Sequence, residues 1–578
     1  MNHTFIKGMD ISTYPEMLDK GYKYYDYDGN EVNLIDFAVS QGFNYGRLRI
    51  WNEPGNVPAA GGYCDLAHTK HMAQEIKKRG LGLLLDFHYS DWYADPGTQT
   101  KPLAWEGLDN DELTAAVYDF TRKVLMELDD AGAYPDMVQI GNEIRCGMIW
   151  PEGKTDHWPM LARLINAGIK AVRDTQKQRE TKIMLHLDQG GRYYYLEEWF
   201  DNCLSHGVTD FDIIGLSYYA FWHGGYHDVK NSMEKLAERY GRPLILAEIA
   251  HGYRIIENGL YDKPQEELSG FPSSPEGQKQ VMELEMCITA NITGNKGLGV
   301  FYWEPFCMPG GMDDSWAKSM SIVDETGKAM EGLKAFRENP YDFDPAKYVK
   351  LYAPGKIKLT EEMAGELLKH LPDKLKALRF DGNMDKLPVT WHNGTELKPG
   401  YHEITGSCNG ETITIPIEIV KNTDSVNLIA NSSFEDGLDC WNIKKSDCVD
   451  VQIREQIAEE LPYDACNYLY VKGKDKFVFH VSQTVKITKN GTYQFSLSFL
   501  GDNTTGVKVE MYLSADGIET SHAIFPEEIW HEHGIDFEVT QLDKDHTEIE
   551  LEVGLKMDSP ISYGKIKDMK LESMKLFL

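Results

Sequence analysis

The sequence lacks the features that several large classes of protein require. No run approaches the roughly 20 apolar residues that span a bilayer. The nine cysteines contain no CxxC pair, which argues against a zinc site or a dense disulfide framework. Cations are also scarce: 59 Lys and Arg stand against 91 Asp and Glu, and the net charge is −32. This balance disfavours nucleic acid and anionic membranes as partners, because both need a basic face.

A signal peptide is not visible at the start of the chain. Met1 to Thr4 run directly into the first predicted strand, without the basic and apolar segments that such a leader carries. Two compartments therefore stay open: the cytoplasm, or the outside of the cell after removal of a leader. A neutral polysaccharide is a partner that suits an acidic chain in either place.

What the sequence does contain is a regular alternation of strands and helices over its first 340 residues. A chain of 578 residues is too long for a single core, so we expect two to four domains. Eight apolar, β-branched runs alternate with amphipathic stretches such as 65–79, 111–131, 158–179 and 228–240. The predicted strands are 5–11, 45–51, 81–87, 137–142, 182–187, 212–218, 243–248 and 298–304. This pattern predicts a (β/α)₈ barrel. An open doubly wound sheet is the alternative, but no glycine-rich phosphate loop follows the first strand.

Two glutamates stand at the ends of predicted strands. Glu143 lies in Val-Gln-Ile-Gly-Asn-Glu-Ile and Glu248 in Pro-Leu-Ile-Leu-Ala-Glu-Ile. The carboxyl ends of barrel strands are where active sites form, and a pair of carboxylates is what glycoside hydrolysis needs. The alternative is two ordinary strand-end acids that cap helices. Polar and aromatic residues after five other predicted strands favour a cleft over that alternative.

The segment after the third predicted strand carries a specific resemblance. Residues 85–97, Leu-Asp-Phe-His-Tyr-Ser-Asp-Trp-Tyr-Ala-Asp-Pro-Gly, followed by Lys-Pro-Leu-Ala-Trp at 101–105, closely resemble glycoside hydrolase family 53, the endo-β-1,4-galactanases. Three further segments, at 47–51, 141–151 and 215–224, are similar to the same family. The resemblance covers about residues 5–340 in the same order.

The resemblance implies a retaining barrel glycosidase in which Glu143 is the acid/base and Glu248 the nucleophile. It implies that Asn142 binds the sugar 2-hydroxyl and that Trp303 stacks beneath a sugar ring. We expect Arg49 to be the cationic neighbour of the nucleophile and Tyr219 to be its hydrogen-bond donor, with Arg47 as a structural partner in the barrel interior. The remaining residues expected to line the cleft are His88, Trp92, Asp188, Trp222 and His223, each of which packing alone would also explain.

The sequence also departs from the usual family pattern. Ile249 to Tyr253 replace the common run after the nucleophile, and Arg145-Cys146 replace a small polar pair after the acid/base. These changes leave the two glutamates intact but affect the sugar subsites. No acidic ligand run occurs at 249–275, so we expect no calcium site there. We expect no metal in the active site and no cofactor.

The last 240 residues change to short strands separated by turns. We predict three domains: the barrel at 1–342, a bacterial immunoglobulin-like β-sandwich at 343–424, and a jelly-roll carbohydrate-binding-like module at 425–578. The first of the two β modules resembles spacers of secreted polysaccharide enzymes. The second is expected to bind galactan through a few exposed Trp or Tyr, or else to act as a structural cap.

The predicted function is therefore endo-acting cleavage of β-1,4-galactan or arabinogalactan. A related barrel glycosidase acting on mannan or glucan would share the two glutamates. A non-catalytic polysaccharide-binding protein is a second alternative, which the presence of both glutamates disfavours. Because galactan of plant cell walls is too large to enter a cell, we expect an extracellular or cell-surface enzyme, with the cytoplasm as the alternative. We expect a monomer without membrane insertion.

Overall fold

The chain is described here by a computed structural model in which residues 4–353 are continuous. Beyond them, the structure describes 357–364, 367–369, 371–392, 397–421, 427–434, 436–456, 466–473, 475–501, 507–515, 518–524, 526, 530–544, 546–560 and 562–573. The described residues divide into two compact units, Met1–Leu351 with Ala377–Asp385, and Tyr352–Lys376 with Lys386–Leu578. Each unit is described by itself.

The first unit contains a closed barrel of eight parallel strands in the order β1-β10-β9-β8-β7-β6-β5-β4. These strands are β1 Ile6–Asp10, β4 Tyr45–Ile50, β5 Gly82–Phe87, β6 Met137–Ile140, β7 Lys182–Leu187, β8 Ile213–Tyr218, β9 Leu244–Ile249 and β10 Gly297–Tyr302. A small hairpin of β2 (Tyr24–Tyr25) and β3 (Glu31–Val32) lies outside the barrel sheet. The prediction of a (β/α)₈ barrel is confirmed, and the open sheet is excluded by the β1–β10 pairing.

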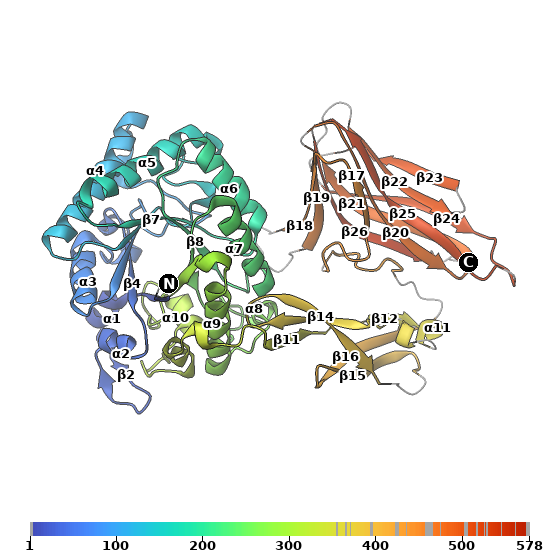
Figure 1. Cartoon of the computed structure of the whole chain (residues 1–578), viewed down its shortest axis with the longest axis horizontal. Coiled ribbons are helices and arrows are strands. Elements are labelled where there is room, and N and C mark those ends of the chain that lie inside the picture. The colour runs from blue at the N-terminus through green and yellow to red at the C-terminus, as the bar shows by residue number, and fades with distance from the viewer. Residues whose placement is uncertain are drawn as a thin grey trace. The chain divides into compact units, whose positions relative to one another are not determined.

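Helices alternate with these strands and surround the barrel (Figure 1). They are α1 Tyr14–Asp19, α2 Leu34–Ser40, α3 Leu66–Lys78, α4 Asn110–Asp130, α5 Trp158–Thr175, α6 Tyr193–Ser205, α7 Tyr226–Tyr240, α8 Lys263–Ser269, α9 Pro275–Ala290 and α10 Asp314–Met320. Capping side chains set several of the starts. Asp109, for example, accepts hydrogen bonds from the first turn of α4 in a reciprocal capping box with Glu112.

The barrel interior is filled by side chains from alternating strand positions. One buried cluster contains Leu84, Met184, Ile245 and Phe301 from four different strands. This packed layer closes the barrel below its carboxyl ends. No helix among the described residues is long and apolar enough to cross a membrane.

The strands that follow the barrel form three further sheets. One has six strands in the order β11-β13-β14-β15-β16-β12. Its elements are β11 Tyr348–Tyr352, β12 Ile357–Thr360, α11 Glu361–Ala364, β13 Lys374–Arg379, β14 Met384–Trp391, β15 Gly400–Cys408 and β16 Glu411–Val420. The predicted all-β character of this region is confirmed. Its hydrogen-bonded strands form one sheet, and β12 and β16 pair in parallel.

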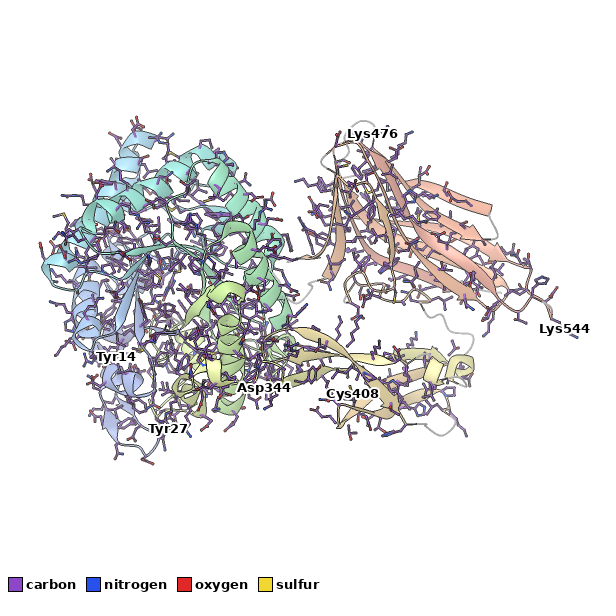
Figure 2. All side chains as sticks on the ribbon, viewed as in Figure 1. Tyr14, Tyr27, Asp344, Cys408, Lys476 and Lys544 are labelled. Carbon is purple, nitrogen blue, oxygen red and sulfur yellow. The ribbon has the colours of Figure 1, made fainter. Side chains whose placement is uncertain are left out.

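The last two sheets each have five strands, in the orders β17-β20-β25-β22-β23 and β18-β19-β26-β21-β24. Their bounds are β17 Asn442–Lys445, β18 Val449–Gln456, β19 Cys466–Gly473, β20 Phe477–Ile487, β21 Gly491–Gly501, β22 Lys508–Ala515, β23 Ile518–Ile524, β24 His531–Val539, β25 Ile549–Ser559 and β26 Tyr563–Ser573. One apolar core contains residues of both sheets, such as Phe479 and Phe495. Lys476 and Lys544 lie near opposite ends of the β20–β25 pair (Figure 2). This arrangement agrees with the predicted antiparallel β module, although the predicted boundary between residues 424 and 425 lies outside the described residues.

Candidate active site

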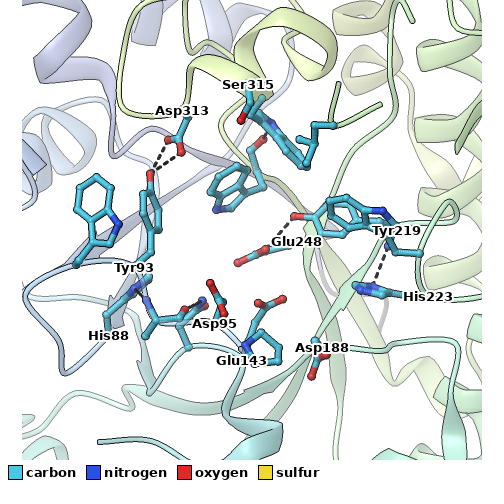
Figure 3. A pocket seen from close by; sticks show the side chains of 18 residues that line it. His88, Tyr93, Asp95, Glu143, Asp188, Tyr219, His223, Glu248, Asp313 and Ser315 are labelled. Carbon is cyan, nitrogen blue, oxygen red and sulfur yellow. Dashed lines mark hydrogen bonds between the residues drawn. The ribbon is translucent and has the colours of Figure 1, made fainter. Parts of the chain in front are cut away.

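A cleft of about 500 Å³ lies at the carboxyl ends of the barrel strands. Its walls are largely aromatic, and acidic side chains lie at its centre (Figure 3). It is lined by His88, Trp92, Tyr93, Ala94, Asp95, Pro96, Asn142, Glu143, Asp188, Tyr219, Trp222, His223, Glu248, Leu260, Trp303, Asp313, Ser315 and Trp316. Aromatic faces beside acidic groups suit a sugar, which offers both apolar C–H faces and hydroxyl groups.

Glu143 and Glu248 lie close together in this cleft. Glu248 belongs to β9, while Glu143 follows β6 and has left-handed backbone angles, φ 47° and ψ 49°, at the start of a short 3₁₀ turn. Such angles are uncommon for a residue other than glycine and tend to occur at functional sites. One carboxylate oxygen of each glutamate lies within 4.8 Å of the other. Figure 3 shows both carboxyl groups directed into the same space.

Two side chains bind the carboxylate of Glu248 directly. Nη1 of Arg47 lies 3.0 Å from Oε1, and the hydroxyl of Tyr219 donates to Oε2 at 2.9 Å. The hydrogen bond expected from Tyr219 is therefore present. The expectation that Arg49 is the cationic neighbour is wrong, because Arg47 holds that place.

Arg47 and Arg49 point to the same side of β4, and both contact Asp10, but their other carboxylate partners differ. Arg47 also contacts Asp10 at 3.0 Å and Asp86 at 2.8 Å in the barrel interior. Arg49 instead lies 2.5 Å from Glu304 and 3.3 Å from Asp313, two residues that follow β10 in the chain. The two-residue spacing moves Arg49 along the strand, one layer away from the carboxylate of Glu248.

Burial raises the pKa values of both cleft glutamates above those of exposed acids. The pKa of Glu143 is raised well above its usual range, first by burial and then by the negative charges of Glu248 and Asp188. Burial also raises the pKa of Glu248, but Arg47 and the Tyr219 hydrogen bond oppose this effect. A proton is therefore held more strongly on Glu143 than on Glu248, which is the division of roles that acid and nucleophile need.

The environment of His186 bears on whether the two glutamates form a metal site. A ring nitrogen of His186 lies within 4.8 Å of the two carboxylates. However, Nδ1 is 3.0 Å from the side chains of Gln139 and Asn142, and Nε2 is 2.9 Å from Ser217 Oγ. Both ring nitrogens thus have hydrogen-bonding partners within the protein, so His186 helps to position the side chains of Gln139, Asn142 and Ser217.

Comparison with known proteins identifies the family. The sequence model of glycosyl hydrolase family 53 matches residues 6–336. The chain belongs to this family. The match covers the whole barrel and ends before the C-terminal sheets.

Proteins named as galactanases are similar over the same region. An arabinogalactan endo-β-1,4-galactanase of Thermothelomyces thermophilus is 31% identical over 336 residues, which cover 57% of this chain and 98% of that protein. An endo-β-1,4-galactanase of Bacillus subtilis is 33% identical over 352 residues, covering 59% of this chain and 79% of its own length. The solved family 53 catalytic domain of Ignisphaera aggregans is 34% identical with a TM-score of 0.55, and the match covers 58% of this chain and 95% of that domain.

The structure brings nearly all of the predicted site residues of this family 53 chain to one cleft. Besides the two glutamates, the predicted residues that line it are His88, Trp92, Asn142, Asp188, Tyr219, Trp222, His223 and Trp303. Arg49 is not among the residues that line the cleft, and it is 1% exposed. Its guanidinium group lies 4.8 Å from the ring centre of Tyr93 and 6.0 Å from that of Trp303, so it supports the cleft wall.

The side-chain amide of Asn142 is held at both ends by hydrogen bonds. Its Oδ1 accepts from Arg47 and from Gln139, each at 2.9 Å, and its Nδ2 donates to the carbonyl oxygen of Ala94 at 2.8 Å. The side chain of Arg47 thus connects the amide of Asn142 to the carboxylate of Glu248. This arrangement holds the residues beside both glutamates in one rigid network.

Several residues of the cleft escaped the sequence reasoning. They are Tyr93, Asp95, Leu260, Asp313, Ser315 and Trp316. The hydroxyl of Tyr93 donates to Asp313, at 2.6 and 2.7 Å from its two oxygens, and the rings of Trp303 and Trp316 meet edge to face at 4.6 Å. The segment Asp-Asp-Ser-Trp at 313–316 follows the eighth strand. This position could have indicated Asp313, Ser315 and Trp316 as cleft residues.

Proposed function

We propose that the protein is an endo-acting β-1,4-galactanase that cleaves galactan or arabinogalactan by double displacement. The observation that carries the proposal is the close approach of the Glu143 and Glu248 carboxylates, within 4.8 Å between one oxygen of each. Retaining glycosidases hold their two carboxyl groups about 5–5.5 Å apart, whereas inverting enzymes leave roughly 6.5–9.5 Å for a water molecule. The names of the family 53 relatives support the choice of galactan as the substrate.

In the first step, Glu143 donates its proton to the glycosidic oxygen while Glu248 attacks the anomeric carbon. The bond from that carbon to the leaving sugar breaks, and a glycosyl ester of Glu248 forms. In the second step, Glu143 takes a proton from water, and the hydroxyl group replaces Glu248 at the anomeric carbon. The raised pKa of Glu143 favours the protonated form that the first step requires.

The remaining cleft residues are proposed to hold the sugar chain. Asn142 hydrogen-bonds the 2-hydroxyl next to the cleaved bond, and Trp303 stacks on the ring there. His88, Trp92, Asp188, Trp222 and His223 form the other sugar contacts, with Arg49 acting from behind the wall. The ring of His223 is neutral at physiological pH, because burial lowers its pKa to about 3. These steps use side chains alone and call for no cofactor.

The organisation of the chain supports action on an insoluble polymer. We propose the three domains 1–342, 343–424 and 425–578, in which the last domain binds polysaccharide and keeps the enzyme on its substrate. We further propose that the protein is a monomer that works outside the cell on galactan of pectin, since such a polymer cannot enter a cell.

The test is release of reducing sugars from linear β-1,4-galactan, with mannan and carboxymethyl-cellulose as controls. The native chain should release short galacto-oligosaccharides, and Glu143→Gln and Glu248→Gln should each lower the rate at least a hundredfold, on the order of a general-acid contribution. Glu283→Gln on helix α9 is the matched control and should retain the rate. No release from galactan, or equal release from mannan, would contradict the proposed substrate.

The stereochemistry of the first product tests the mechanism separately. Proton NMR should detect the β-anomer of the new reducing end before mutarotation. Initial appearance of the α-anomer would instead show a single displacement and would remove the nucleophile role of Glu248.

A further inference from the structure

The loop after strand β5 is tied to the turn that carries Glu143. Gln99 lies in this loop and is 1% exposed, and its Nε2 donates to the carbonyl oxygen of Asn142 at 2.8 Å. The same nitrogen donates to the carbonyl oxygen of Asp95 at 3.0 Å. The main-chain oxygen of Gln99 accepts from the amide of Trp150 at 2.8 Å. One residue therefore holds the chain on both sides of Glu143, at Asn142 and at Trp150.

The bond to the carbonyl group of Asn142 bears on the direction of the Glu143 side chain. This carbonyl belongs to the peptide unit that joins the two residues, and Glu143 itself has left-handed angles, φ 47° and ψ 49°. Such angles are unfavourable for a residue other than glycine, so contacts with the surroundings must hold the turn. Because the peptide unit is planar, a bond that fixes its carbonyl oxygen also fixes the direction in which the next residue leaves it.

The loop that contains Gln99 also forms part of the cleft wall. Asp95 and Pro96 line the cleft, and Figure 3 shows Asp95 near Glu143. Asp95 and Thr98 exchange two main-chain hydrogen bonds, at 2.8 and 3.0 Å, so this part of the loop is a tight turn. The pKa of Glu143 is raised first by burial, and the negative charge of Asp95 adds to that effect. The position of the loop thus matters to the acid/base.

Packing alone does not explain a glutamine at position 99. The Oε1 atom of Gln99 is buried and has no hydrogen-bond partner among the described residues. A buried polar atom without a partner destabilises the folded state, and a methionine of similar length would fill the space without that cost. What the amide adds, and a methionine would not, is the pair of hydrogen bonds from Nε2.

We propose that Gln99 is a positioning residue for the acid/base: it holds the carbonyl group of Asn142 so that the carboxyl group of Glu143 faces the glycosidic oxygen. The inference rests on the proposed function of the barrel, in which Glu143 protonates the leaving sugar. Gln99 is not among the described residues that line the cleft, so it acts through Glu143 and not on the substrate. A proton donor must lie within hydrogen-bond reach of the oxygen that it protonates, so a small change in its direction slows the transfer.

A substrate that needs no proton donor separates this role from a general disturbance of the cleft. A sugar leaves galactan only when the glycosidic oxygen is protonated, whereas dinitrophenolate leaves as a stable anion. The test compares kcat/KM for galactan with kcat/KM for dinitrophenyl β-1,4-galactobioside, using the full-length chain. Gln99→Met should lower the value for galactan about tenfold, as expected for lost hydrogen bonds, and the value for the aryl substrate less than about twofold.

Gln278→Met is the matched control. Gln278 of helix α9 is 0% exposed, and its Nε2 donates to the carbonyl oxygen of His251 at 2.8 Å. It is thus also a buried amide that holds the backbone after a barrel strand, but on the side of Glu248. Both substrates need the nucleophile, so Gln278→Met should leave the ratio of the two kcat/KM values unchanged.

This ratio, measured on one preparation, does not depend on the fraction of folded enzyme. If Gln99→Met does not fold at all, Gln99→Asn takes its place, because its side chain is one methylene group shorter and draws the amide away from the carbonyl group of Asn142. The same loss on galactan and sparing of the aryl substrate are expected.

Three results would overturn the proposal: equal losses on both substrates in the Gln99 variant, no loss on either, or the same galactan-selective loss in Gln278→Met. Glu143→Gln, assayed on the same two substrates, tests the proposed function separately and should lose activity on galactan far more than on the aryl substrate. Equal losses in Glu143→Gln would contradict its role as the acid. A selective loss in Glu143→Gln without one in the Gln99 variant would contradict only the inference about Gln99.

Discussion

The two cleft glutamates differ in what surrounds their carboxyl groups. Glu143 has Glu248 and Asp188 as anionic neighbours, whereas Glu248 contacts Arg47 and Tyr219. The charge of Asp188 is itself held in place by Arg145, whose Nε donates to Oδ1 at 2.8 Å. Single neighbouring residues thus give two identical side chains different proton affinities, which the proposed mechanism uses.

Asp188→Asn should move the basic limb of the kcat/KM profile to lower pH. Removal of a negative charge beside Glu143 lowers the pKa of that group, so Glu143 loses its catalytic proton earlier as pH rises. The acidic limb, which the proposed mechanism assigns to ionisation of Glu248, serves as the internal control and should stay in place. An unchanged basic limb would mean that Asp188 does not influence the proton on Glu143.

Tyr219→Phe should move the acidic limb to higher pH and lower kcat about tenfold. The lost hydrogen bond favours the ionised form of Glu248, and hydrogen bonds to charged groups contribute about 1.5–3 kcal/mol. Tyr218→Phe is the matched control, because its hydroxyl donates to the carbonyl oxygen of Gly224 at 3.0 Å and not to Glu248. Equal effects in both variants would indicate a general disturbance of strand β8.

At the scale of single elements, helix α9 carries an unusual buried acid. Most of its residues are buried, and Glu285 is 0% exposed, with neither carboxyl oxygen bonded to a partner among the described residues. Burial raises the pKa of Glu285 well above its usual range. The folded state thus binds this proton more tightly than the unfolded state, so stability falls as pH rises above the pKa of an unfolded glutamate.

Glu285→Gln should stabilise the barrel at neutral pH and have little effect near pH 4. The expected gain is about 1–3 kcal/mol in the free energy of unfolding, because folded Glu285 must take up a proton at neutral pH, at about 1.4 kcal/mol per pH unit above its unfolded pKa, and glutamine needs none. Denaturant midpoints at the two pH values measure it. Glu283→Gln provides the control, since Glu283 pairs with Lys279 near the surface of the same helix; a similar gain there would point to helix charge and not to burial.

At the scale of the whole molecule, the C-terminal β module has a core of its own. The buried cluster that includes Phe479, Phe495, Leu555 and Leu571 contains only residues between 429 and 571. A core that is closed in this way is expected to unfold as a separate cooperative unit.

Phe495→Ala should lower the midpoint temperature of one calorimetric transition, that of the C-terminal β module, and leave the barrel intact. Phe495 is 0% exposed, and loss of such a side chain costs about 3–5 kcal/mol. Galactan hydrolysis on a soluble substrate should continue at the native rate. Phe87→Ala, in strand β5, is the reciprocal control and should lower the other transition together with activity. A single transition that shifts as a whole in both variants would contradict independent units.

The sequence alone determined the barrel, because eight apolar runs with helical periodicity between them admit few other folds. It also determined that Glu143 and Glu248 share one end, since parallel strands place their carboxyl ends together. The segment at residues 85–97 further indicated a resemblance to enzymes that hydrolyse β-1,4-galactan. These conclusions depend on order and spacing along the chain, and both can be read without coordinates.

Only the tertiary structure decided which side chains meet. Arg47 and Arg49 are both arginines and point to the same side of strand β4. Barrel closure nevertheless placed Arg47 against Glu248 and Arg49 against Glu304. Likewise, no local pattern indicated that Arg454 and Lys565, from strands separated by β19, would lie on neighbouring tyrosines. Contacts between distant segments depend on strand register and layer height, and single-sequence periodicity reports only which face of an element a residue occupies.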